Sequence, residues 1–329
     1  MADELDSWAR ERAPDLLARA EDEAVAVLRD ALVDAALGQR RHDRPPRRSP
    51  ETSAPGAAPT RAQPAGHGLW AYCVLQAGEP LPSDLLGIDG ESPLELVEAD
   101  RLAALVSRVP LAEFGAEPLR ENLNDLGWLE RVARGHEAVL ERLLGESTIV
   151  PLRLCTIFES DQGVRDMLER EHDSLVRALD ALRGREEWGV KLLADGDRLA
   201  EAARARSSEV AALEDELGTR TGGGAYMLGR RLERHVREAA DVLAAEVADE
   251  VRTELESCAI DSVVLPPQNP ELSGHEGRML LNCAYLVDAE RVQELRDRVA
   301  ELEQRHSELG VHIESTGPWP PYNFVLGGP

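Results

Sequence analysis

Hydrophobic residues recur every three or four positions between residues 14 and 37, which predicts one amphipathic helix. Pro14 suits its first turn and Gly38 its end, so residues 1–38 form the first predicted segment. Residues 39–68 are rich in Pro, Arg, Ala and Ser without periodicity, which predicts a disordered linker. The helix is therefore expected to be tethered, either as a marginal helix lying loosely on the rest of the chain or as a docking helix for another protein.

Residues 69–183 alternate between strand-like and helix-like patterns and are predicted to form an N-terminal α+β domain. The near-continuous apolar run at 148–158 is typical of a central strand. The order of elements is close to half of a ferredoxin-like fold with an irregular start. Strands are expected at 69–76, 94–98, 102–109 and 148–158, and helices near 125–144 and at 161–182.

Residues 184–329 give the order strand, two helices, two strands, helix, strand, which is a βαββαβ unit with an enlarged first crossover. We predict a C-terminal ferredoxin-like domain with a long helical hairpin at about 197–257. The predicted fold class is α+β, with two ferredoxin-like domains after the N-terminal helix and linker. The elements are expected at 188–193, 197–217, 226–255, 262–266, 279–286, 289–309 and 311–315.

The last strand runs into a proline-rich elbow, residues 316–321, that is expected to stop it, because proline fixes φ and lacks an amide donor. Trp319, Tyr322 and Phe324 cluster there, in a chain with only five Trp, four Tyr and three Phe. Such a cluster is either the last plug of a core or an anchor for a partner. The usual burial of large rings favours the plug. Trp319–Pro320 is a place where a cis bond is tolerated, and the sequence leaves its isomer open.

Charge narrows the kinds of partner. The chain carries a net charge of −25, with +4 on residues 40–68 and −23 on residues 69–329. Because residues 69–329 are so acidic, they would repel phosphate groups, which disfavours binding to nucleic acid or to a membrane surface. The four cysteines are widely spaced, as expected of small buried hydrophobes in an intracellular chain. Neither a signal peptide nor a membrane-spanning stretch is recognisable, so we expect a cytoplasmic protein.

Catalytic motifs are not recognisable in the sequence. The eight histidines show no paired metal spacing, and His136 on an apolar helix stripe is expected to be a core residue. The run Gly222-Gly223-Gly224 lacks the lysine of a phosphate-binding loop and more simply relieves a bend between two helices. We therefore predict no catalytic, metal-binding or cofactor-binding residues, no cofactor and no small-molecule substrate.

Several segments resemble the GvpF/GvpL family of gas vesicle proteins, in the family's order and from residue 69 to 326. They are LWAYCVL (69–75), VPLRLCTIF (150–158), EWGVKL (187–192), GGGAYMLGRR (222–231), NPELSG (269–274), MLLNCAYLVD (279–288) and GPWPPYNFV (317–325). The resemblance implies two α+β domains and an accessory protein of gas vesicle assembly. Its implied partners are the hydrophobic gas vesicle shell protein and other gas vesicle accessory proteins. An amphipathic partner needs a complementary surface, and the aromatic elbow makes Trp319, Tyr322 and Phe324 the candidate partner-binding residues.

A second function class stays open, because ferredoxin-like folds host many activities. The alternative is a small-ligand-binding or sensory ferredoxin-like protein without a gas vesicle role. A deep pocket with convergent polar groups and shifted pKa values would favour this alternative. Exposed apolar patches on a flat acidic body would favour the assembly role.

Overall fold

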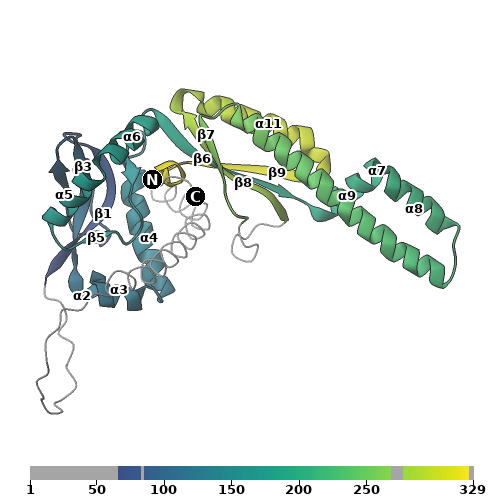
Figure 1. Cartoon of the computed structure of the whole chain (residues 1–329), viewed down its shortest axis with the longest axis horizontal. Coiled ribbons are helices and arrows are strands. Elements are labelled where there is room, and N and C mark those ends of the chain that lie inside the picture. The colour runs from purple at the N-terminus through teal and green to yellow at the C-terminus, as the bar shows by residue number, and fades with distance from the viewer. Residues whose placement is uncertain (1–65, 83–84, 268–276, 326–329) are drawn as a thin grey trace, which may run out of the picture. The chain divides into compact units, whose positions relative to one another are not determined.

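The computed structural model describes residues 66–82, 85–267 and 277–325. The predicted helix at 14–37 and nearly all of the predicted linker lie outside the described residues, as do residues 269–274. The chain divides into two compact units between Ala181 and Leu182, each with its own antiparallel sheet and helices (Figure 1). The protein is therefore of the α+β class.

The first unit is built on a sheet of strand order β2-β3-β1-β4, with β5 also paired to β1. All of its pairs are antiparallel. The strands are β1 (His67–Gln76), β2 (Leu94–Ala99), β3 (Leu102–Pro110), β4 (Val150–Pro151) and β5 (Ile157–Phe158). The helices are α2 (Leu111–Phe114), α3 (Ala116–Asn122), α4 (Leu126–Glu141), α5 (Asp161–Arg170) and α6 (His172–Leu182).

The prediction of a central strand at 148–158 is wrong. The segment lies at the edge of the sheet and pairs with β1 through the two-residue strands β4 and β5 rather than as one continuous strand. Two local features break it: Pro151 cannot donate to a ladder, and Cys155 has a φ of 64°. Its hydrophobic run reflects burial of Ile149, Val150 and Leu154 beside β1 rather than a place between two strands.

His136 is a core residue of the first unit, as predicted. It is fully buried, accepts a hydrogen bond at Nδ1 from Trp70 Nε1 (3.0 Å) and stacks on the Tyr72 ring with centroids 5.4 Å apart. Because Nδ1 is the acceptor, the proton of the neutral imidazole lies on Nε2. Burial lowers the pKa of His136 to about 4 and raises the pKa of Tyr72 to about 12.

The second unit has a four-stranded antiparallel sheet of order β7-β8-β6-β9. Its strands are β6 (Arg185–Ala194), β7 (Asp261–Val264), β8 (Arg278–Asp288) and β9 (Val311–Trp319). Its α-helices are α7 (Gly196–Arg206), α8 (Ser208–Gly218), α9 (Gly223–Glu256), α11 (Val292–His306) and α12 (Tyr322–Val325), with 3-10 turns η1 (Ala289–Arg291) and η2 (Ser307–Leu309).

Two of the predicted helices are interrupted. The helix expected at 161–182 breaks at Glu171, between α5 and α6. The helix expected at 197–217 breaks at Ser207, which has an extended conformation (φ −90°, ψ 114°) and accepts a hydrogen bond at Oγ from Val210 N (3.3 Å). Ser207 therefore ends α7 and caps α8, the role that serine commonly takes at a helix start.

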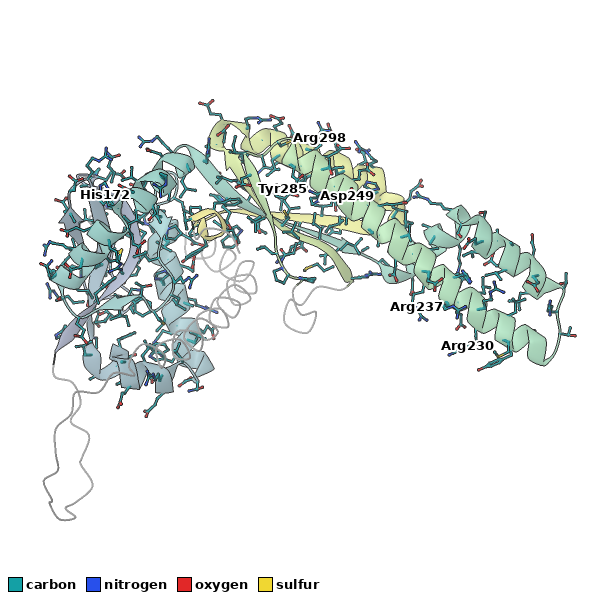
Figure 2. All side chains as sticks on the ribbon, viewed as in Figure 1. His172, Arg230, Arg237, Asp249, Tyr285 and Arg298 are labelled. Atoms are coloured by element: carbon teal, nitrogen blue, oxygen red, sulfur yellow. The ribbon has the colours of Figure 1, made fainter. Side chains whose placement is uncertain are left out.

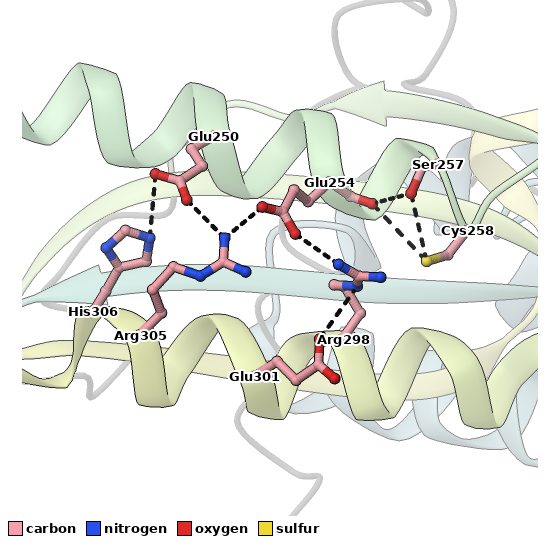
Figure 3. A network of polar contacts seen from close by, with 8 residues as sticks. All are labelled: Glu250, Glu254, Ser257, Cys258, Arg298, Glu301, Arg305 and His306. Atoms are coloured by element: carbon pink, nitrogen blue, oxygen red, sulfur yellow. Dashed lines mark hydrogen bonds and ion pairs between the residues drawn. The ribbon is translucent and has the colours of Figure 1, made fainter.

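One face of the second sheet packs against α11 and the C-terminal half of α9. Alternate residues of the strands, such as Trp188, Val190 and Leu192 of β6, enter this core. Between the two helices, Glu254 of α9 pairs with Arg298 (2.9 Å) and Arg305 of α11. Glu250 of α9 also pairs with Arg305 (2.8 Å), as Figure 3 shows. The hydrogen bond from Arg305 lowers the pKa of Glu254. These contacts tie α9 to α11.

The N-terminal half of α9 runs beyond the sheet and packs on α7 and α8 instead (Figure 1). The small core between them consists of Val210, Leu213, Leu228, Leu232 and Val236. These three helices, residues 196–256, form the helical hairpin. Its tip is the part of α9 nearest Gly223, together with α8.

Candidate partner-binding surfaces

The proline-rich elbow does not stop the last strand where the sequence suggested. β9 continues from Val311 to Trp319, and Glu187 of β6 pairs with Trp319. A strand can carry Pro318 here because β9 lies at the edge of the sheet, where a missing amide donor breaks no ladder bond. The cis peptide bond is Gly317–Pro318, not Trp319–Pro320.

Gly317 allows the elbow to lie directly against β6. Gly317 has a φ of 150°, and a Cβ at this position would lie 2.8 Å from Cδ2 of the Trp188 ring. The same Trp188 ring receives the Arg296 guanidinium at 4.6 Å from its centroid, and its Nε1 donates to Glu186 Oε2 (3.0 Å). The elbow is thus held by a close approach that leaves no room for a side chain.

Beyond the elbow, a buried carboxylate holds the short helix α12. Glu187 is fully buried; its Oε2 accepts from Asn323 N (3.1 Å) and its Oε1 accepts from Asn323 Nδ2 (2.7 Å). A buried charge is tolerated only when it is well hydrogen-bonded, so the two groups depend on each other. The contact joins residues 136 positions apart in the sequence.

The three predicted site residues differ in access. Trp319 is only 2% exposed, and its Nε1 donates to Thr316 Oγ1 (3.1 Å). Tyr322 and Phe324, both on α12, are half-buried. A partner that meets the surface of this structure would therefore reach Tyr322 and Phe324 but not the Trp319 ring.

The helical hairpin presents a second surface. On α9, Tyr226 and Met227 are each 69% exposed and Val242 is 59% exposed. A groove of about 370 Å³ lies where α7 and α8 break against α9, and residues that line it include Ser207, His235 and Val242. Tyr226 and Met227 are neighbours near the start of α9, and adjacent large exposed hydrophobic side chains are typical of an interaction surface.

The first unit contains a larger groove, of about 1010 Å³, along α2 and α3. One of its carboxylates, Glu113, accepts hydrogen bonds from Trp128 Nε1 (2.7 Å) and Arg131 Nη2 (3.3 Å). The buried groups of the first unit whose pKa values shift strongly, Tyr72, Cys73 and His136, lie in the core and do not line this groove. The groove therefore lacks the convergent, perturbed polar groups of a typical active site.

Metal-binding groups of three or more His, Cys, Asp or Glu side chains are not found among residues 66–82, 85–267 and 277–325. Across the same residues, every helix is too short or too polar to cross a membrane.

Comparison with known proteins places the chain in a family. The family model described as "Gas vesicle synthesis protein GvpL/GvpF" matches residues 68–326. Gas vesicle protein L of Streptomyces sp. (strain CB03234) is 42% identical over 248 residues, which are 74% of this chain and 87% of that protein. Gas vesicle protein F of the same strain is 28% identical over 258 residues, 78% of this chain and 98% of that protein. The chain belongs to the GvpL/GvpF family of gas vesicle proteins.

The fold agrees with this placement. The crystal structure of GvpF from Anabaena sp. PCC7120 superposes with a TM-score of 0.62 at 20% identity and covers 79% of this chain and 98% of that chain. GvpF from Microcystis aeruginosa gives a TM-score of 0.54 at 21% identity, covering 78% of this chain and 98% of that chain. The family resemblance read from the sequence segments is confirmed, and family membership supports an accessory role in gas vesicles.

Sequence reasoning missed the pairing of Glu187 with Asn323. On β6 the apolar core residues alternate with Glu187, Gly189 and Lys191, so Glu187 reads as a solvent-facing residue. It is buried, and its carboxylate is hydrogen-bonded to Asn323, which lies 136 positions further along the chain. Nothing in the local pattern signals that contact.

Proposed function

We propose that this protein is a non-enzymatic accessory factor of gas vesicle assembly that binds the hydrophobic shell protein or other gas vesicle accessory proteins in the cytoplasm. The observation that carries the proposal is the family match over residues 68–326. A protein with this role needs surfaces that accept an amphipathic partner. The adjacent, exposed side chains of Tyr226 and Met227 on α9 supply such a surface.

We further infer an L-type role. The chain is 42% identical to gas vesicle protein L and 28% identical to gas vesicle protein F of one Streptomyces strain. Replacing each of those two genes in turn with the gene for this chain tests the inference. Restoration of gas vesicles only in the strain that lacks L supports it, and restoration only in the strain that lacks F contradicts it.

Two finer proposals follow from the second unit. Its strand order β7-β8-β6-β9, with helices between β6 and β7 and between β8 and β9, supports a ferredoxin-like assignment. The half-buried rings of Tyr322 and Phe324 support a partner contact at α12, with Trp319 as the buried support behind it.

Co-purification tests the binding role. The tagged full-length chain is co-expressed separately with the shell protein and with each accessory protein of its gas vesicle gene cluster, and soluble complexes are recovered. We expect at least one of these proteins to co-purify, and the paired substitution Tyr322→Ala/Phe324→Ala to reduce that recovery if α12 contributes. Failure to recover any gas vesicle protein with the folded full-length chain would contradict the proposal.

A further inference from the structure

The long helix α9 is divided by charge. Its N-terminal part, residues 223–237, contains four arginines and a single acidic residue, Glu233. Its C-terminal part, residues 238–256, contains seven acidic residues and a single arginine, Arg252. The chain as a whole has 62 acidic and 37 basic side chains, so this positive segment of α9 contrasts with the net charge of −25.

Several other arginines in the second unit pair with carboxylates. Arg252 pairs with Asp249 (2.8 Å) and Glu256 (2.6 Å), and Arg298 pairs with Glu254 (2.9 Å). Along residues 223–237 of α9 the situation differs. Among the residues that the structure describes, Arg230, Arg231 and Arg237 have no carboxylate within 4.0 Å, and Arg234 reaches Glu238 only at 3.9 Å.

The same part of the helix exposes its largest apolar side chains. Tyr226 and Met227 each precede an arginine, Arg230 and Arg231, by four residues, which is about one helical turn. Both are 69% exposed, and all four arginines are exposed. Figure 2 shows Arg230 and Arg237 on the side of α9 that faces away from α7 and α8. Tyr226, Met227, Arg230, Arg231, Arg234 and Arg237 define the α9 arginine face.

We propose that the α9 arginine face binds a short acidic amphipathic helix of another gas vesicle protein, an inference that rests on the proposed function. Unpaired guanidinium groups beside an aromatic and a thioether side chain match a partner with carboxylates next to apolar side chains. Residues spaced three or four apart on α9 suit a partner helix with the same spacing.

The size of the face limits the partner. From Tyr226 to Arg237 the face spans about 17 Å at 1.5 Å per residue, or about three helical turns. Immediately beyond it the helix presents Glu238 and then Asp241. A broad polyanion, such as an anionic membrane, would meet these carboxylates at the same time, within about one Debye length of 8 Å. A partner helix of about three turns would lie on the face without meeting Glu238 or Asp241.

Binding of a peptide probe tests the face on the full-length protein. The probe is a synthetic peptide of about 20 residues, long enough to be helical when bound, with Glu and Leu on one face of its three central turns only. A second peptide has Gln in place of each Glu. Fluorescence anisotropy measures binding to the wild-type chain and to Arg230→Gln/Arg231→Gln/Arg237→Gln. Glutamine keeps helix propensity and removes the charge.

We expect the wild-type chain to bind the Glu peptide, more weakly at higher salt, and the Gln peptide much less. The triple variant should lose about tenfold in affinity, the sum of three exposed ion pairs. A matched control, Arg101→Gln/Arg120→Gln/Arg177→Gln, removes three exposed charges from the first unit and should bind normally. Lysine in place of Arg230, Arg231 and Arg237 should retain most of the binding. Circular dichroism checks that each variant folds.

Other results would overturn the inference. No binding by the wild-type chain, or equal loss with the control variant, contradicts it. If the wild-type chain self-associates and the triple arginine variant does not, the partner of the face is a second copy of this chain. If the wild-type chain binds anionic lipid vesicles in preference to the peptide, the partner is a membrane.

Gas vesicle formation separates this inference from the proposed function. If the wild-type gene and the triple arginine variant both restore vesicles in a strain lacking the gene, this inference fails while the proposed function stands. If the wild-type gene does not restore them, the proposed function fails.

Discussion

Glu187 illustrates how single residues tie the end of the chain to the sheet. The side chain has no exposed surface, and both carboxylate oxygens accept hydrogen bonds from Asn323. Gly317, two residues before Trp319, brings the chain against the Trp188 ring. Buried polar contacts of this kind fix one arrangement, because each group left without its partner is costly.

Removing the Glu187 carboxylate should destabilise the protein. We expect Glu187→Ala to lower the free energy of unfolding by about 2 kcal/mol, because Asn323 keeps its donors but loses their acceptor. Urea unfolding of Glu187→Ala, Asn323→Ala and the double variant measures the effect. The two single losses should add to clearly more than the loss in the double variant. Additive losses would show that the pair is not coupled.

Protonation of His136 should oppose folding. Its pKa is lowered to about 4 in the folded protein, against 6.5 for the ordinary imidazole, so below pH 6.5 the unfolded chain binds a proton that the folded one does not. Its contribution to stability is therefore present above pH 6.5 and is lost as the pH falls toward 4. The loss amounts to about 3 kcal/mol at 1.36 kcal/mol per pH unit.

NMR titration of the histidine ring signals checks this value directly. The His136 imidazole should stay neutral at pH 5.5. An ordinary titration of His136 near pH 6.5 would mean that the ring is not held neutral in the core.

At the scale of elements, the hydrophobic pattern predicted most helices and strands but not their interruptions. Apolar periodicity gave α4, α9 and β1 because each buries one continuous face or run. It failed at Ser207, where a single capping side chain ends one helix and begins the next. It also failed at 148–158 and at β9, where the position of a strand in its sheet, a tertiary property, decides whether proline is tolerated.

Loss of the Ser207 cap should loosen the helical hairpin locally. We expect Ser207→Ala to lower the free energy of unfolding by about 1 kcal/mol, because the amide of Val210 loses its side-chain acceptor. Hydrogen exchange should be faster in α8 than in the wild-type chain, with α11 unchanged. Ser207→Asp should restore protection, since aspartate caps helices as well as serine does. Unchanged exchange in Ser207→Ala would contradict the capping role.

At the scale of the whole molecule, the family match identifies the kind of protein, and the charge distribution bears on where a partner could bind. The chain is strongly acidic, with a net charge of −25, yet one helix exposes unpaired arginines beside Tyr226 and Met227. The sequence segments from 69 to 326 were enough to predict the family, and the matching family model spans residues 68–326. The candidate surfaces needed the structure, because exposure and unpaired charge depend on what packs beside each residue.

Deletion of the gene in the organism that encodes this chain tests the central claim most directly. Intact gas vesicles are counted by electron microscopy in the parent strain, in the deletion strain and in the deletion strain that expresses the full-length chain again. An assembly factor predicts few or no vesicles after deletion and normal numbers after complementation. Normal vesicle numbers in the deletion strain would contradict a required role in gas vesicle assembly.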